Sequence, residues 1–228
     1  MNVLIYLRRN PANTQLGLML ALTFTTGIVD AIGYLGLDRV FTGNMTGNVV
    51  ILGMGLIGGT GLPVAGPAIA LAAFMCGAAA GGRVLREDLH AWTMRHTWLF
   101  TAVAAVLLLA SLPAVLVTSP GRPWQYAITA ALGAAMGCQA ATARHIAVKD
   151  VTTVVVTSTL TGLASDSVLG RGEGQPWRRR AAAVLLIGLG ALTGAALLKV
   201  HFGWGLVTAG LIIAAAAWIG HAAQPART

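Results

Sequence analysis

The stretch GIVDAIGYLGLDRVFTGNMTGNVV, residues 27–50, decides the fold because it joins an apolar helix to a polar, glycine-rich segment. Its first part completes a run that begins at Thr14 and carries one charge, Asp30, before Leu37. Its second part, FTGNMTGN at 41–48, is dense in Thr, Gly and Asn. A hydrocarbon core about 30 Å thick requires roughly 20 apolar residues in a helix. The stretch therefore predicts a membrane span followed by an element that is broken at membrane depth.

The whole chain has the composition of a polytopic membrane protein. Of its 228 residues, 56% are hydrophobic and only 10% are charged, whereas soluble domains carry about 25% charged residues. The 15 Lys and Arg residues give a net charge of +8, but they cluster at the ends of apolar segments, as membrane topology requires. We therefore expect membrane lipids as partners and no nucleic acid, and leave open a homo-oligomer.

Six segments are long and apolar enough to span a bilayer, and two more are ambiguous. The six are 14–37, 64–83, 97–118, 124–146, 179–200 and 203–221. The ambiguous segments, 40–58 and 150–169, begin with polar residues. The sequence predicts an all-α polytopic membrane protein, in one integral membrane domain over 1–228, with six transmembrane helices and two re-entrant or broken elements.

The basic residues favour six crossings over eight. Cytoplasmic loops are enriched in Lys and Arg. With six crossings and a cytoplasmic N-terminus, twelve of the 15 basic residues lie inside and Arg39, Arg122 and Lys199 lie outside. With eight full crossings, a 4+4 parallel repeat, the division becomes eight and seven and the bias is lost. We therefore expect a multi-pass membrane protein with both termini in the cytoplasm.

The chain contains signs of an internal repeat, with halves at about 14–118 and 124–221. Three groups of small and polar residues recur in the same order, 110 to 115 residues apart: Gly27 with Gly137, Thr42 and Thr46-Gly47 with Thr157 and Thr161-Gly162, and Gly77-xxx-Gly81 with Gly190-xxx-Gly194. With three spans in each half, the second copy enters the membrane from the opposite side. Inverted repeats of this kind build many transporters.

The two polar elements supply the candidate binding residues. Non-helical backbone at membrane depth must be shielded by protein or line a wet cavity, and hydroxyl and amide side chains can satisfy it or bind a solute. A helix that starts near Thr46 would also direct free N–H groups into the cavity, which favours an anionic or carbonyl-bearing guest. The candidates are Thr42, Asn44, Thr46, Asn48, Thr157 and Thr161. A capped, tightly packed helix start is the alternative reading.

Asp30 completes the set, because ionisable groups within spans are costly and are functional candidates by default. It can serve as a cation or proton site, or as a partner for Arg39. The chain has no catalytic or metal-binding motif, so we expect no enzyme activity, no cofactor and no metal. At the position that matches Asp30 the second half carries Ala140, which makes Asp30 the asymmetric element of the repeat.

The block at 27–50, together with VTTVVVTSTLTGLASD at 151–166, resembles the YoaK-type bacterial inner-membrane proteins, a family of unknown function usually described with six spans. The resemblance extends over most of the chain. It implies a location in the cytoplasmic membrane and a transport role, without a substrate. The leading hypothesis is thus a small-solute or ion transporter or channel, with a midplane site framed by the two broken elements and Asp30. A structural or assembly protein without flux is the first alternative, and a membrane enzyme is the least favoured.

Overall fold

The described part of the chain in the computed structural model comprises residues 7–88, 92–116, 121–146, 156–168, 170–172 and 177–224, and it is helical without a strand. Eight helices carry the fold: α2 (Pro11–Gly36), α3 (Met45–Leu56), α4 (Ala65–Val84), α5 (Met94–Leu116), α6 (Arg122–Ile146), α7 (Val156–Ser165), α8 (Trp177–Val200) and α9 (Phe202–Ala222). The six long helices begin and end within three residues of the six spans expected from the sequence. The two short helices fall inside the ambiguous segments 40–58 and 150–169.

Among the described residues, five helices are long and apolar enough to cross a membrane, namely α2, α4, α5, α8 and α9. The 25-residue α6 is long enough but less apolar. It carries polar groups on its protein-facing side, where Thr129, Gln139 and Thr142 are buried. The protein is therefore an all-α polytopic membrane protein, and the sixth crossing is more polar than hydropathy alone would select.

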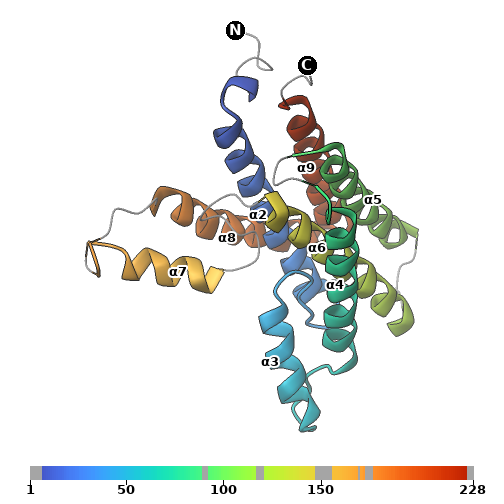
Figure 1. Ribbon diagram of the computed structural model, residues 1–228. Coiled ribbons are helices and arrows are strands. Elements are labelled where there is room, and N and C mark those ends of the chain that lie inside the picture. Colours follow the sequence, from blue (N-terminus) through green and yellow to red (C-terminus); the bar gives the residue numbers. More distant parts are fainter. Residues whose placement is uncertain are drawn as a thin grey trace.

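The long helices pack as one bundle in which they cross one another (Figure 1). Helices α2 and α8 run in the same direction, since Phe24 lies beside Gly190 and Gly36 beside Leu198. The most extensive helix pairs are α4 with α6, α2 with α8, and α5 with α9. Large buried side chains of four helices, α2, α5, α6 and α9, fill the core, among them Leu22, Phe100, Leu132 and Ile213. The short helices lie at the margin, α3 against α4 and α7 against α8.

Contacts at the helix ends fix the direction of each helix. At one end of the bundle, Arg8 donates a hydrogen bond to the carbonyl of Ala222 at 3.1 Å, and the rings of His96 and His145 are joined at 3.1 Å between Nε2 and Nδ1. The start of α2, the start of α5, the end of α6 and the end of α9 therefore lie together. At the other end, the end of α2 packs against Phe202, the first residue of α9.

Glycines set the close approach at two helix pairs. A Cβ on Gly77 of α4 would collide with the backbone of Ala134 in α6, and one on Gly137 of α6 would collide with the backbone of Phe74. In the α2–α8 pair, Gly27 faces the backbone of Ile187 and Gly190 faces that of Phe24 in the same manner. Small residues allow helix backbones in membranes to approach closely and gain van der Waals contact.

The chain between α2 and α4 folds back on itself. After α2 ends at Gly36, the backbone returns along that helix, so that the carbonyl of Val40 lies against Gly33 and the Thr42–Gly43 backbone lies beside Asp30. The 12-residue α3 then runs away from Asp30, and Gly55 near its end contacts the segment just before α4. Gly58, Gly59 and Gly61 adopt φ values of 78°, 69° and 64° in the turn that follows, a region that favours glycine.

The second short helix is attached differently. None of the residues of α7 is buried, and it lies outside the bundle beside α8 (Figure 1). Arg180 of α8 donates a hydrogen bond to Asp166, just after α7, at 2.7 Å. Residues 147–155, which include part of the expected element at 150–169, lie outside the described residues.

Candidate functional site

Asp30 holds the polar loop that precedes α3. Its Oδ1 atom accepts backbone N–H bonds from Gly43 at 2.6 Å, Thr42 at 2.9 Å and Asn44 at 3.4 Å, and the Thr42 hydroxyl lies at 3.3 Å. The residue is only 8% exposed. Backbone N–H groups that would otherwise be unsatisfied at the start of a helix are thus bound by a carboxylate. The sequence had predicted that these N–H groups would be free to bind an anionic guest. In the structure they are occupied by Asp30.

Asn48 and Asn44 complete the loop. The Asn48 side chain accepts from the Phe41 amide at 2.9 Å and donates to the Phe41 carbonyl at 2.6 Å, so it closes the loop as a two-bond bridge. Asn44 is the N-cap of α3 and accepts from the Gly47 amide at 3.2 Å. Side-chain oxygens at this position satisfy orphan helix donors. The spacing FTGNMTGN therefore encodes a loop whose polar backbone is satisfied within the protein.

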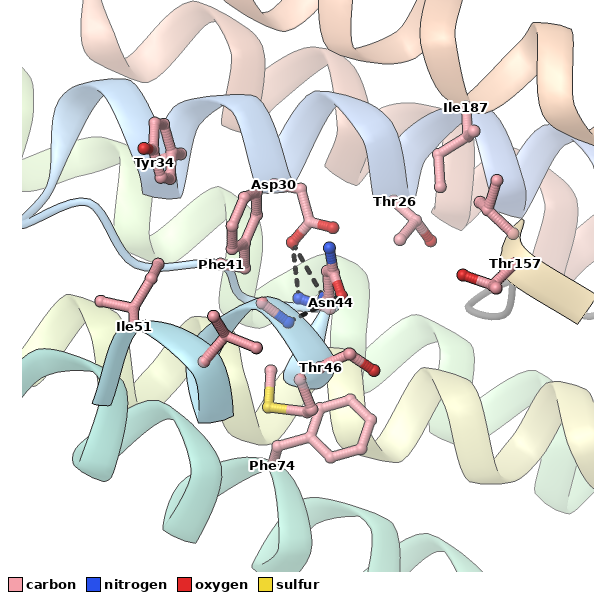
Figure 2. A pocket seen from close by; sticks show the side chains of 15 residues that line it. Thr26, Asp30, Tyr34, Phe41, Asn44, Thr46, Ile51, Phe74, Thr157 and Ile187 are labelled. Atoms are coloured by element: carbon pink, nitrogen blue, oxygen red, sulfur yellow. Dashed lines mark hydrogen bonds between the residues drawn. The ribbon is translucent and has the colours of Figure 1, made fainter. Parts of the chain in front are cut away.

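A cavity of about 830 Å³ opens beside this loop. Five helices and the loop contribute to its wall: Thr26, Asp30 and Tyr34 from α2; Phe41, Gly43 and Asn44 from the loop; Met45, Thr46, Gly47, Val50 and Ile51 from α3; Phe74 from α4; Val156 and Thr157 from α7; and Ile187 from α8. Figure 2 shows Asp30 between the aromatic ring of Phe41 and the hydroxyls of Thr26 and Thr157. The two short helices thus meet at one cavity, although only α3 is anchored to the bundle core.

The second carboxylate oxygen of Asp30 is not engaged by the described residues. All four bonds go to Oδ1, and Oδ2 points into the cavity (Figure 2). The hydroxyls of Thr46 and Thr157 also form no hydrogen bond within the described part of the chain. The cavity wall, as described, includes no Lys, Arg or His. The charge of this carboxylate is therefore balanced by backbone dipoles on one side only.

The structure separates the seven residues expected at the site into three groups. Asp30, Asn44, Thr46 and Thr157 line the cavity. Thr42 and Asn48 are completely buried and hold the loop. Thr161 lies one turn beyond Thr157, where its hydroxyl donates to the Thr157 carbonyl at 3.0 Å and is exposed. Arg39, the alternative partner of Asp30, is an exposed residue with φ of 50°, and the bonds to Asp30 come from the loop instead.

Sequence reasoning missed the aromatic wall and a buried amide. Tyr34 and Phe41 stack with ring centroids 4.8 Å apart at the edge of the cavity. Gln139 of α6 is 1% exposed and donates to the hydroxyl of Thr26 at 3.2 Å, whereas its Oε1 atom has no partner among the described residues. An amide in the middle of the Ala- and Gly-rich part of the fourth span was a signal that could have identified Gln139.

This fold defines the class of the protein as a helical polytopic membrane protein, with a buried carboxylate at a partly open cavity. The chain belongs to the family described as "Protein of unknown function (DUF1275)", which matches residues 18–219. It is 33% identical over 158 residues to the UPF0700 transmembrane protein YoaK of Bacillus subtilis (strain 168). That alignment covers 68% of this chain and 66% of the relative, just under two thirds of its length. The resemblance inferred from the sequence is thereby confirmed, and no solved structure matches the chain.

Proposed function

We propose that this protein is a small-solute or ion transporter or channel of the bacterial inner membrane. The observation that carries the proposal is the free Oδ2 atom of Asp30 in a cavity of about 830 Å³ walled by both short helices. A carboxylate inside a membrane span is costly to keep. A packing role requires only the Oδ1 atom, which already receives every hydrogen bond made to this side chain by the described residues.

The glycine contacts support an inverted repeat. The α2–α8 contacts of Gly27 with Ile187 and of Gly190 with Phe24 have counterparts in the α6–α4 contacts of Gly137 with Phe74 and of Gly77 with Ala134. Each counterpart lies 110 or 113 residues away from the residue it matches. The short helices also pack in equivalent ways in the two halves, since α3 contacts the long helix that follows it, α4, and α7 contacts the long helix that follows it, α8. Such a repeat places a substrate site at the interface of its halves.

The geometry of α3 supports a re-entrant element. Twelve helical residues rise about 18 Å, too short for a hydrocarbon core of about 30 Å. The helix starts beside Asp30 and ends where α4 begins, so its polar start lies deep and its end returns to the level of the end of α2. Residues 40–58 would then enter and leave at one face of the membrane.

The distribution of arginines supports a cytoplasmic location for both termini. The end of the bundle where Arg8 meets Ala222 also carries Arg95, at the start of α5, and Arg144, at the end of α6. Arg83 stands in the last turn of α4, and Arg95 donates to the Val84 carbonyl at 3.2 Å, which places this arginine at the same end. Enrichment of basic residues on one side is the signature of the cytoplasmic face.

Flux through reconstituted protein tests the proposal. Proteoliposomes are exposed to gradients of sodium chloride, potassium chloride, ethylammonium chloride, sodium acetate and glycerol, and the response is followed by light scattering and by transport current. We expect at least one solute to cross faster than in protein-free vesicles, and Asp30→Asn to lower that rate at least tenfold. Gly188→Ala is the matched control, because a Cβ at Gly188 meets nothing within 4 Å.

Size-exclusion chromatography and thermal unfolding of each variant keep the result interpretable. If Asp30→Asn retains the elution volume and melting behaviour of the parent and loses flux, the proposal is supported. Absence of flux for every solute class, with copurification of one stoichiometric partner, would overturn it in favour of an assembly role.

A further inference from the structure

The charge of the cavity points to the charge of its ligand. Asp30 is the only acidic residue within the eight described helices. Its side chain is more than nine-tenths buried, and its free oxygen is directed into the cavity, where the described wall has no basic side chain. A buried charge is costly unless it is paired. The site is therefore complementary to a cation and disfavours an anion.

The rest of the cavity wall is suited to the apolar part of an organic ligand. Around the carboxylate lie the stacked rings of Tyr34 and Phe41, the ring of Phe74 and the side chains of Met45 and Ile187. Aromatic faces attract ammonium groups, and pockets of about 300–1,000 Å³ that are mainly apolar with a few polar groups are typical of small-molecule sites. The two free threonine hydroxyls, of Thr46 and Thr157, add acceptors for N–H groups.

A bare metal ion fits this wall less well. Hard cations such as Ca²⁺ and Mg²⁺ take about six or more oxygen ligands in a compact shell. The described residues contain no group of three or more His, Cys, Asp or Glu side chains that could hold a metal. One carboxylate oxygen and scattered hydroxyls among aromatic rings match a ligand that carries its own apolar surface.

We propose that the cavity binds an organic ammonium ion, with the ammonium group paired to the Oδ2 atom of Asp30 and the apolar body lying against Tyr34, Phe41 and Phe74. This inference rests on the proposed transport function, for which it names the substrate class. The ammonium restores charge balance at the carboxylate, and the aromatic rings contact the apolar body. The same wall that rejects anions thus selects for amines with a hydrocarbon or aromatic substituent.

An isosteric set of probes tests the ligand class. Binding of phenethylammonium, 2-phenylethanol and phenylacetate to the purified full-length protein is measured by isothermal titration calorimetry and by the shift in melting temperature. A ligand that binds only the native state raises its apparent stability. We expect phenethylammonium to bind at least tenfold more tightly than the neutral alcohol, and phenylacetate to show no binding.

Two variants locate the site. Asp30→Asn should abolish the preference for phenethylammonium over 2-phenylethanol, while Gly188→Ala should retain it. Tyr34→Leu provides a second probe, which removes none of the hydrogen bonds to Asp30. Tyr34 is 38% exposed at the cavity edge, where its ring stacks on Phe41 of the loop. It should weaken phenethylammonium binding about three- to fivefold through loss of a cation–π contact.

The outcomes separate this inference from the proposed function. Equal binding of the cation and the alcohol, or binding of Na⁺ or K⁺ alone, would overturn the ligand class. Flux of another solute without phenethylammonium binding would also overturn it and leave the transport function standing. Binding of phenethylammonium that depends on Asp30, with no flux of any solute, would support the ligand class and overturn transport.

Discussion

At the scale of single residues, the two carboxylate oxygens of Asp30 have different surroundings. Oδ1 holds the loop through the amides of Thr42 and Gly43, and Oδ2 faces the cavity. Asn48 resembles a site residue in the sequence but serves only the loop, because both ends of its amide bind the backbone of Phe41. Polar side chains of this short segment therefore either bind the loop backbone or line the cavity, depending on the direction in which each one points.

Asn48→Ala should destabilise the protein. The substitution removes both bonds to Phe41, and each partly buried backbone group left unsatisfied costs about 1–3 kcal/mol. We expect a melting temperature several degrees lower in detergent, measured by the fluorescence of the native tryptophans during heating. Thr46→Ala is the control, because the Thr46 hydroxyl bonds to no described residue. Equal stability of the two variants would contradict the bridging role of Asn48.

At the scale of elements, the two short helices differ because their anchors differ. The start of α3 is bound to Asp30 in α2, whereas the position that matches Asp30 in α6 is Ala140. Without a carboxylate there, the described contacts of α7 are with α8, through Arg180 and Asp166. In the proposed repeat, the half that carries the carboxylate therefore has the docked short helix, and the half that carries Ala140 has the peripheral one.

The link between α7 and α8 should depend on pH. The hydrogen bond from Arg180 holds the pKa of the Asp166 carboxyl below its usual value of 3.8. Because the folded-state pKa is depressed, the stabilisation is present above the unfolded pKa and is lost as pH falls through the folded one. Protection of the α7 amides from hydrogen exchange, taken relative to the intrinsic rate at each pH, should be lost only below pH about 4, and in Arg180→Gln it should already be low at neutral pH. Unchanged exchange in that variant would contradict the link.

The close helix pairs should tolerate no extra methyl group. In Gly190→Ala the new Cβ collides with the Phe24 backbone, and such overpacking typically costs about 1–3 kcal/mol. Gly188→Ala, two residues away on the same helix, should leave the melting temperature unchanged or slightly raised. The corresponding pair in α4 is Gly77→Ala with Gly82→Ala as control. Melting curves of the four variants measure the effect, and equal losses at Gly188 and Gly190 would argue against the packing described.

At the scale of the whole molecule, the bundle is consistent with six crossings and two elements that do not cross. The start of α2 and the end of α9 lie at one end (Figure 1). The turn after α3 lies at the other end, beside the start of α4. An even number of crossings follows if each long helix spans the membrane once. The 8-span alternative would require α3 to reach the opposite end, which its contacts with the segment before α4 oppose.

Cysteine labelling measures this topology. In a variant with Cys76 and Cys138 replaced by Ala, single cysteines are introduced by Thr60→Cys, Lys199→Cys and Arg86→Cys. A membrane-impermeant maleimide added to intact cells should label Thr60→Cys and Lys199→Cys but not Arg86→Cys. Labelling of position 60 only after the membrane is opened would place the turn after α3 in the cytoplasm, and the inverted repeat would then be untenable.

The sequence by itself determined what depends on local hydropathy and spacing. Long apolar runs fixed the membrane class and placed the six long helices within three residues, because a helix in lipid must satisfy its own backbone. Asp30 and the Thr-Gly-Asn loop, which the sequence singled out by residue type, lie at the described cavity.

Only the tertiary structure decided which polar groups face the cavity and which face the backbone. Thr42 and Thr161 are the same residue type as Thr46 and Thr157, and Asn48 is the same type as Asn44. Their separation depends on side-chain direction and on neighbours distant in the chain. Tyr34, Phe74 and Ile187 come from three helices and become one wall only when those helices pack. A cavity is a property of the space between elements, so no local pattern of residues could specify its lining or the free oxygen that enters it.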